Sequence, residues 1–107
     1  MKKILKFKVE LDENNLPDSI KMFGEKLEDS GMDLKALMIA AWDAKKQETI
    51  RVDIWTKDMP VHEMFILYHQ NMLGMATSLE KSTGESKLAE ALRDYCGFFA
   101  EKTKIIG

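Results

Sequence analysis

The chain has 107 residues, of which 45% are hydrophobic and 32% are charged, and its formal net charge is -2. This length suits a single domain spanning residues 1–107, and the composition is that of a soluble globular protein rather than a disordered one. The weak net charge gives no electrostatic basis for binding nucleic acid or an anionic membrane. The single cysteine, Cys96, excludes an internal disulfide and fits a reducing compartment.

The N-terminus resembles a signal peptide only briefly, because Lys6, Lys8 and Glu10 interrupt any apolar stretch. The longest run without Asp, Glu, Lys or Arg extends from Met64 to Leu79, and it is shorter than the ~20 apolar residues of a membrane span. We therefore expect a cytoplasmic protein with no membrane insertion.

Alternating apolar and polar residues predict strands in the first half of the chain. In chain order these strands are expected at Leu5–Leu11, Ser19–Phe23, Leu34–Trp42 and Thr49–Trp55. The segment Gly24–Gly31 is polar and is expected to be a loop. A polar turn at residues 43–48 predicts that the last two strands form an antiparallel hairpin.

The register of this hairpin follows from its apolar positions. If Ala44 and Gln47 close the turn, three apolar pairs face one another, namely Ala41–Ile50, Ile39–Val52 and Leu37–Ile54. We expect this face of the hairpin to be the core face. The opposite face, called the outer face below, then carries Ala36, Met38, Ala40, Trp42, Thr49, Arg51, Asp53 and Trp55.

The second half of the chain predicts two helices. The first runs from Pro60 to Thr83, with Gly84 as its C-terminal stop, and its middle is nearly uncharged. The second runs from Ser86 to Lys102, and its apolar stripe consists of Leu88, Leu92, Tyr95, Cys96 and Phe99. Ile105 and Ile106 are expected to dock as an apolar tail. The order predicts an α+β fold in which a small antiparallel sheet of three to four N-terminal strands is packed by two C-terminal α-helices.

The sequence contains no recognisable catalytic, cofactor-binding or metal-binding motif. His62 and His69 lie on one predicted helix about 10 Å apart, too far to share one metal ion. Cys96 lies on an apolar stripe and is expected to be a buried small hydrophobe. We therefore predict no catalytic residue, no metal site and no cofactor. An enzymatic function would require folding to bring His62 or His69 beside Asp58.

The feature that remains is a surface. Met38, Trp42, Arg51, Asp53 and Trp55 are the predicted partner-binding residues, because tryptophan and arginine are enriched in interface hot spots and an aromatic face is rarely left open. The alternative is that the N-terminal segment or loops of the protein cover the tryptophans. The expected partner is another protein or, in a homodimer, a second copy of the chain.

Several runs of residues carry a family resemblance. They are Lys8–Asn14, Pro17, Ile20, Ala41–Asp43, Thr49–Pro60, Glu63–Met64, His69–Gln70, Met75–Ala76, Ala89 and Phe99–Lys102. On these residues the chain resembles the gliding motility protein GldC family, and Arg51–Pro60 is the most specific part. The family usually has a tryptophan close after the isoleucine at position 20, where this chain has Met22 and Phe23. The resemblance implies a small cytoplasmic protein associated with bacterial gliding, without a known enzymatic activity.

Two functions follow as expectations. The first is a non-enzymatic accessory protein that acts through protein–protein interaction, with a gliding-machinery component or with itself. The second is a small-ligand sensor in which Met64, Met72 and Met75 line an apolar pocket between the sheet and the first helix. The chain has eight methionines, and methionine at helical spacing more often fills a core than lines a binding site.

Overall fold

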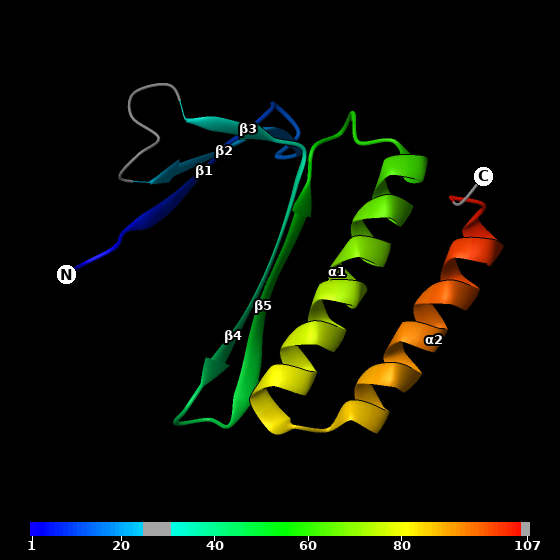
Figure 1. The fold of residues 1–107 in the computed structure, drawn as a ribbon. Coiled ribbons are helices and arrows are strands. Elements are labelled where there is room, and N and C mark those ends of the chain that lie inside the picture. Colours follow the sequence, from blue (N-terminus) through cyan, green and yellow to red (C-terminus); the bar gives the residue numbers. More distant parts are fainter. Residues whose placement is uncertain (25–30, 106–107) are drawn as a thin grey trace. The chain divides into compact units, whose positions relative to one another are not determined.

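The computed structural model describes residues 1–24 and 31–105, and the chain divides into two compact units, Met1–Met59 and Pro60–Gly107. The described residues of the first unit form five strands, and those of the second form two helices (Figure 1). Strands followed by helices confirm the predicted α+β class, although the strands lie in two small antiparallel sheets rather than one.

The first sheet consists of β1 (Leu5–Leu11), β2 (Pro17–Gly24) and β3 (Met32–Leu34), in that spatial order. The limits predicted for β1 are confirmed. β2 begins at Pro17, two positions before the predicted start at Ser19, because the first position of a strand tolerates a residue without an N–H. Ile20, at the centre of β2, is buried. Most of the predicted loop Gly24–Gly31 lies outside the described residues.

The predicted strand Leu34–Trp42 is wrong at its start. Leu34 belongs to β3, which pairs with β2, and a separate strand, β4 (Ala36–Asp43), begins after Lys35 and pairs with β5 (Glu48–Trp55). The chain therefore changes sheets at Lys35. The Thr56 N–H donates to the Lys35 carbonyl at 2.8 Å, which ties the end of β5 to this corner.

The hairpin of β4 and β5 has the predicted register, with Ala41 opposite Ile50, Ile39 opposite Val52 and Leu37 opposite Ile54. Its turn is closed by the Gln47 N–H, which donates to the Asp43 carbonyl at 2.8 Å, with Gln47 at a positive φ of 56°. The Asp43 carboxylate also accepts hydrogen bonds from the N–H groups of Lys45 and Lys46. Local polar contacts and apolar pairing thus agree on one register.

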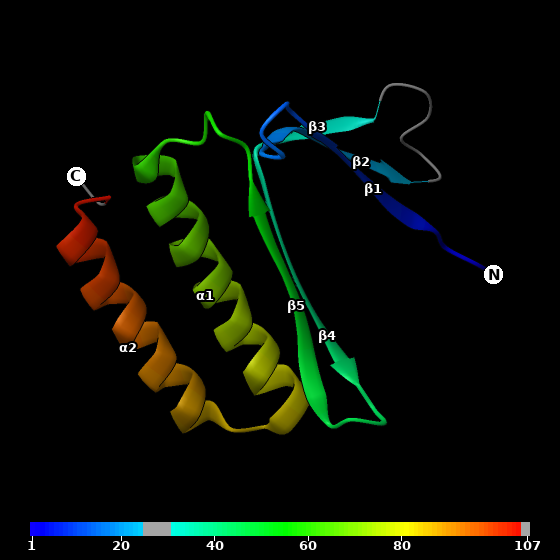
Figure 2. The same ribbon diagram turned by 180° about the vertical axis from the view of Figure 1, so that it is seen from behind.

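The expectation that the apolar face of this hairpin is the core face is not met, because Ile50 and Val52 remain 54% and 42% exposed. The reason lies in the arrangement of the N-terminal unit. Its three-stranded sheet lies at the end of the hairpin remote from the turn, and so it does not cover the length of the face (Figure 2).

The C-terminal unit is a pair of helices, α1 (Val61–Thr83) and α2 (Ser86–Thr103). Pro60 is the cap before α1 rather than its first residue, and the predicted stop is confirmed, since Gly84 has a left-handed φ of 77°. Over residues 60–105, the buried side chains are all small, namely those of Ala76, Ala89, Cys96 and Ala100, which confirms the prediction for Cys96.

An ion pair and an aromatic contact also join α1 to α2. Arg93 donates to Glu80 at 2.8 Å, and the ring of Phe65 meets that of Phe99 edge-on with centroids 6.1 Å apart. The predicted apolar stripe of α2 is wrong in part, because Leu88 and Tyr95 are exposed. Neither helix, over the residues described, is long and apolar enough to span a membrane. Ile106, of the predicted tail, lies outside the described residues.

Candidate interaction surface

All five predicted partner-binding residues lie on the outer face of the β4–β5 hairpin. Met38 pairs with Asp53, Ala40 with Arg51, Trp42 with Thr49, and Ala36 with Trp55. Because side chains alternate along a strand, these four pairs point to one side of the hairpin. The structure therefore brings the predicted residues together, while their role in binding stays a prediction.

The two tryptophans stand at opposite ends of the outer face and are both exposed, Trp42 by 62% and Trp55 by 49%. Trp42 lies next to the turn that joins β4 to β5. Trp55 lies at the other end, where the chain turns out of β5. The alternative was that the protein's own N-terminal segment or loops cover the tryptophans. Within the described ranges, only Trp55 has such neighbours, because it lines a pocket together with Leu16 and Pro17.

An ion pair occupies the middle of the outer face. Arg51 donates to both carboxylate oxygens of Asp53, from Nε at 2.9 Å and from Nη2 at 2.8 Å. This two-pronged geometry fixes both side chains more firmly than a single hydrogen bond would. The hydrogen bonds from Arg51 hold the pKa of the Asp53 carboxyl below its usual value. The centre of the face therefore carries one positive and one negative side chain, which offset each other.

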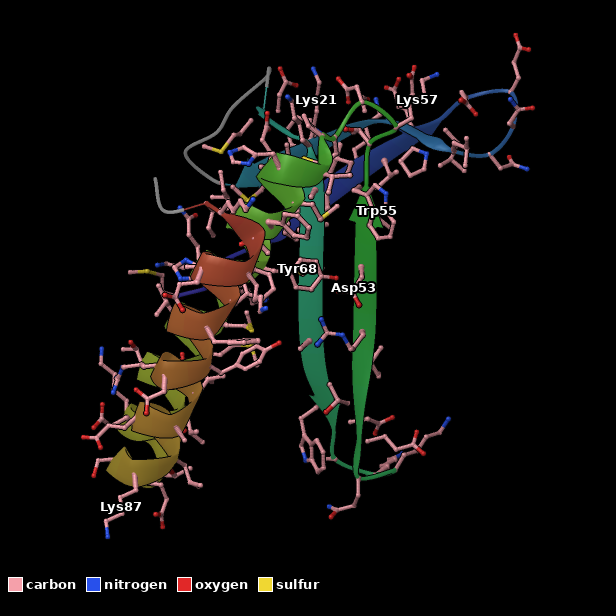
Figure 3. The ribbon with its side chains drawn as sticks, turned by 90° about the vertical axis from the view of Figure 1, so that its right-hand side faces the viewer. Lys21, Asp53, Trp55, Lys57, Tyr68 and Lys87 are labelled. Carbon is pink, nitrogen blue, oxygen red and sulfur yellow. The ribbon has the colours of Figure 1, made fainter. Side chains whose placement is uncertain are left out.

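A pocket of about 370 Å³ opens at the Trp55 end of the hairpin. Figure 3 shows Asp53, Trp55 and Lys57 following one another along this end of β5. The residues that line the pocket are Leu16, Pro17, Asp53, Ile54, Trp55 and Lys57. Sequence reasoning did not identify Leu16, Pro17 or Lys57 as part of the site. The signals available were the family-resemblance residues, which include Pro17 and, two positions after the strand in the specific run Arg51–Pro60, Lys57.

Lys57 links the end of β5 to the residues on the other side of this pocket. Its Nζ contacts Asp12 at 3.1 Å and Asp18 at 3.3 Å, and its backbone N–H donates to the Pro17 carbonyl at 3.2 Å. The two carboxylates raise the pKa of Lys57, Asp12 more than Asp18. Segments far apart in the sequence are thus joined beside Trp55.

Asp12 supports the same junction from the β1–β2 turn. One of its carboxylate oxygens accepts the N–H of Asn14 at 2.8 Å and that of Leu16 at 3.0 Å, while the other accepts from Lys57. The hydrogen bond from Leu16, followed by that from Lys57, holds the pKa of Asp12 below its usual value. The turn is therefore fixed with Leu16 and Pro17 at the pocket.

The residues that an enzymatic function would need have other contacts. The Thr56 hydroxyl donates to the Asp58 carboxylate at 2.6 Å and lowers the pKa of that carboxyl. His69 stacks on Phe99 within the C-terminal unit, with ring centroids 6.4 Å apart. Across residues 1–24 and 31–105, no three His, Cys, Asp or Glu side chains gather in a way that could hold a metal ion.

Comparison with known families decides where the chain belongs. A family model described as gliding motility-associated protein GldC-like matches residues 17–105. The chain belongs to the GldC-like family. The matched region runs from the first residue of β2 through α2, so it includes the whole outer face and, from the pocket, Pro17 and Lys57. Searches of curated proteins and of solved structures returned no match. Membership associates this GldC-like chain with gliding motility.

Proposed function

We propose that this GldC-like chain is a non-enzymatic, cytoplasmic accessory protein of gliding motility that works by binding another protein through the outer face of the β4–β5 hairpin. The observation that supports the proposal is the exposure of Trp42 and Trp55 on one face of that hairpin. Family membership supports the cellular context, and the surface supports the mode of action.

The outer face has the makeup of a protein-binding hot spot. Full burial of a tryptophan removes about 150–250 Å² from water, so covering the exposed half of Trp55 is worth about 2–3 kcal/mol at ~25 cal/mol per Å². The pocket beside Trp55 offers a recess for an apolar side chain of the partner. The Arg51–Asp53 pair supplies fixed polar groups between the two aromatic ends.

The charged groups at this surface support a non-enzymatic role. A general acid or base works best with a pKa near the operating pH. Here the pKa values of Asp12 and Asp53 are lowered and that of Lys57 is raised, so all three move away from neutrality. Each of these groups also forms an ion pair, which favours a structural role for its charge.

The sensor hypothesis has no comparable support. Its three methionines, Met64, Met72 and Met75, all belong to α1. The pocket described above is lined by residues of the N-terminal unit and contains none of these methionines. Its two charged residues, Asp53 and Lys57, are already bound to Arg51 and to Asp12 and Asp18.

The test compares the wild-type protein with Trp55→Ala in native cells. Tagged protein is purified from gliding cells, and the proteins that accompany it are quantified by mass spectrometry. We expect Trp55→Ala to weaken binding of a gliding component about 30-fold, the equivalent of ~2 kcal/mol, while the circular dichroism spectrum stays the same.

The matched control is Phe98→Ala, because Phe98 is an aromatic residue on α2 that is 51% exposed, much like Trp55. This variant should retain the partner. Unchanged binding by Trp55→Ala, or equal losses in both variants, would show that the outer face is not the binding surface. Unfolding of Trp55→Ala would instead assign the side chain to the structure of the pocket.

A further inference from the structure

The edge of β5 that faces away from β4 is the second feature of this hairpin that bears on binding. In the described part of the chain, β5 has a strand partner on one side, β4. The Thr56 N–H points toward β4 and bonds Lys35, whereas the next N–H, that of Lys57, points the other way and bonds Pro17. By the alternation of an antiparallel ladder, Thr49, Arg51, Asp53 and Trp55 direct their backbone groups to the edge away from β4.

This edge has two natural ends. At one end the turn of residues 44–47 takes the chain away, and at the other the Pro17 carbonyl accepts the Lys57 N–H. The stretch available to a further strand therefore runs from Thr49 to Trp55, and its central residue is Val52. A hairpin of two strands is marginally stable alone, and three or more strands are normally needed.

The sequence of this stretch is complementary to itself. If a second β5 lies antiparallel with Val52 opposite Val52, then Arg51 faces Asp53 of the other copy, and this happens twice. Ile50 faces Ile54 in the same register. Sliding either way by one pair on the same face would instead set Arg51 against Arg51 or Asp53 against Asp53, and like charges in direct opposition are destabilising.

We propose that two copies of this chain join edge to edge through β5, around a two-fold axis at Val52, and form a four-stranded antiparallel sheet. The interface is isologous, since the same stretch serves both partners. The inference rests on the proposed function, because the joined sheet would present the outer faces of both hairpins to one side. The dimer would then be the form that binds the gliding partner.

The register also brings the tryptophans of the two copies together. Thr49 pairs with Trp42 within the hairpin and would face Trp55 of the second copy across the new edge. Trp42 and the other copy's Trp55 would thus stand two strands apart on one face, at about 9–10 Å given a strand spacing of ~4.8 Å. The dimer would therefore contain two Trp42–Trp55 clusters, each made of one tryptophan from each copy.

The edges of β1 and β4 fit a second copy less well than the edge of β5. β1 carries a similar ion pair, Lys8–Glu10 at 3.3 Å, and the matching register would place Lys6 opposite Asp12. The ladder would, however, run into the irregularity between Glu10 and Leu11. β4 carries no charge from Ala36 to Trp42, so nothing on that edge selects a register.

The first test uses disulfide crosslinking with Val52→Cys and Ile50→Cys. In the proposed dimer the two positions 52 form a non-hydrogen-bonded pair with Cα atoms about 4.5 Å apart, which a disulfide can bridge. The two positions 50 are offset by four residues, about 13–14 Å at ~3.4 Å per residue, beyond its reach. Both side chains are exposed and lie on the same face of β5, so the variants are matched.

Oxidation with diamide followed by non-reducing electrophoresis should convert Val52→Cys to a covalent dimer at least 10-fold faster than Ile50→Cys. The wild-type chain, whose Cys96 is buried, is the control for the natural thiol. Equal rates in the two variants, or no dimer from Val52→Cys, would overturn the proposal. Because both substitutions are small and at exposed positions, this test does not depend on a disruptive variant.

The second test uses charge reversal and sedimentation across a concentration series. Arg51→Glu alone sets like charges against each other across the two-fold axis, and so does Asp53→Lys alone. A mixture of the two variants restores both opposite-charge pairs between chains, although neither chain regains its own internal pair. We expect each variant alone to dimerise at least 10-fold more weakly than the wild type, and the mixture to recover most of that loss.

The matched control is Lys8→Glu mixed with Glu10→Lys, which reverses the equivalent pair on β1 and should leave dimerisation unchanged. A wild-type chain that stays monomeric, a mixture that does not recover, or a response to the β1 variants would overturn the proposal. Unchanged partner binding by Trp55→Ala, with the wild-type dimer demonstrated, would confine the failure to the proposed function. Partner binding by a monomer would confine it to this inference.

Discussion

Ile20 is the one large apolar side chain of the described N-terminal unit that is buried completely, at 1% exposed. It lies at the centre of β2, opposite Val9 on one side and Leu34 on the other. Replacing Ile20 with Val removes one methylene group from this position. Ile→Val in a core costs about 0.5–1.5 kcal/mol, so we expect a loss of about 1 kcal/mol from the free energy of unfolding.

For a unit of this size, ~1 kcal/mol lowers the melting temperature by about 4–8 °C. Tryptophan fluorescence reports this transition selectively, because both tryptophans, Trp42 and Trp55, lie in the N-terminal unit. Circular dichroism at the helical band follows α1 and α2. Independent units would show a shift in the fluorescence transition only, whereas units that unfold together would show equal shifts in both signals.

The control is Ile50→Val, the same chemical change at a position that is 54% exposed. At concentrations where the protein is monomeric, this variant should shift the melting temperature by less than about 2 °C, since little area is lost from a packed environment. Equal shifts from Ile20→Val and Ile50→Val would refute the assignment of Ile20 as the core of the N-terminal unit.

Three further predictions concern single positions. Gly31→Ala should lower the melting temperature more than Gly24→Ala, because Gly31 has a left-handed φ of 68° and an added Cβ would lie 2.6 Å from the Phe23 ring, against 3.9 Å to the nearest atom at Gly24; equal effects would contradict this. The lowered pKa of Asp12 adds stability above its unfolded pKa that is lost as pH falls through the folded value, while the raised pKa of Lys57 adds stability that is lost only as pH rises through its own folded value in the alkaline range. The melting temperature followed by fluorescence should fall at both acid and alkaline pH, and Lys57→Met should reduce the fall at alkaline pH. An unchanged profile would contradict a stabilising contact between Lys57 and Asp12. Buried Cys96 should react with a thiol reagent no faster than the C-terminal unit opens, so a rate equal to that of a free thiol would contradict its burial.

The hairpin register could be predicted from sequence because two independent signals agreed. Apolar residues alternate along both strands, and the polar turn fixes where the strands face one another. The alternation says which side chains share a face, but it carries no information on whether another element covers that face. This is why Ile50 and Val52 were placed on the correct face and wrongly expected to be core.

Features that depend on distant contacts escaped prediction. The break at Lys35 was missed because Leu34 and Ala36 are both apolar, and a change of sheet partner leaves the apolar run unbroken. The contact between Asp12 and Lys57 joins residues 45 positions apart, and no local pattern encodes it. The pocket that this contact supports therefore appeared only with the fold, although its Trp55 had been identified as a surface residue.

The most direct test of the central claim is site-specific photocrosslinking in gliding cells. Trp42, which is 62% exposed on the outer face, is replaced by the photoreactive residue benzoylphenylalanine, and Leu88, 57% exposed on α2, is replaced in the same way as the control. If the outer face binds protein, irradiation yields a defined heavier product from position 42, containing a gliding component or a second copy of the chain, and little from position 88. No product from position 42, or equal products from both positions, would contradict the account.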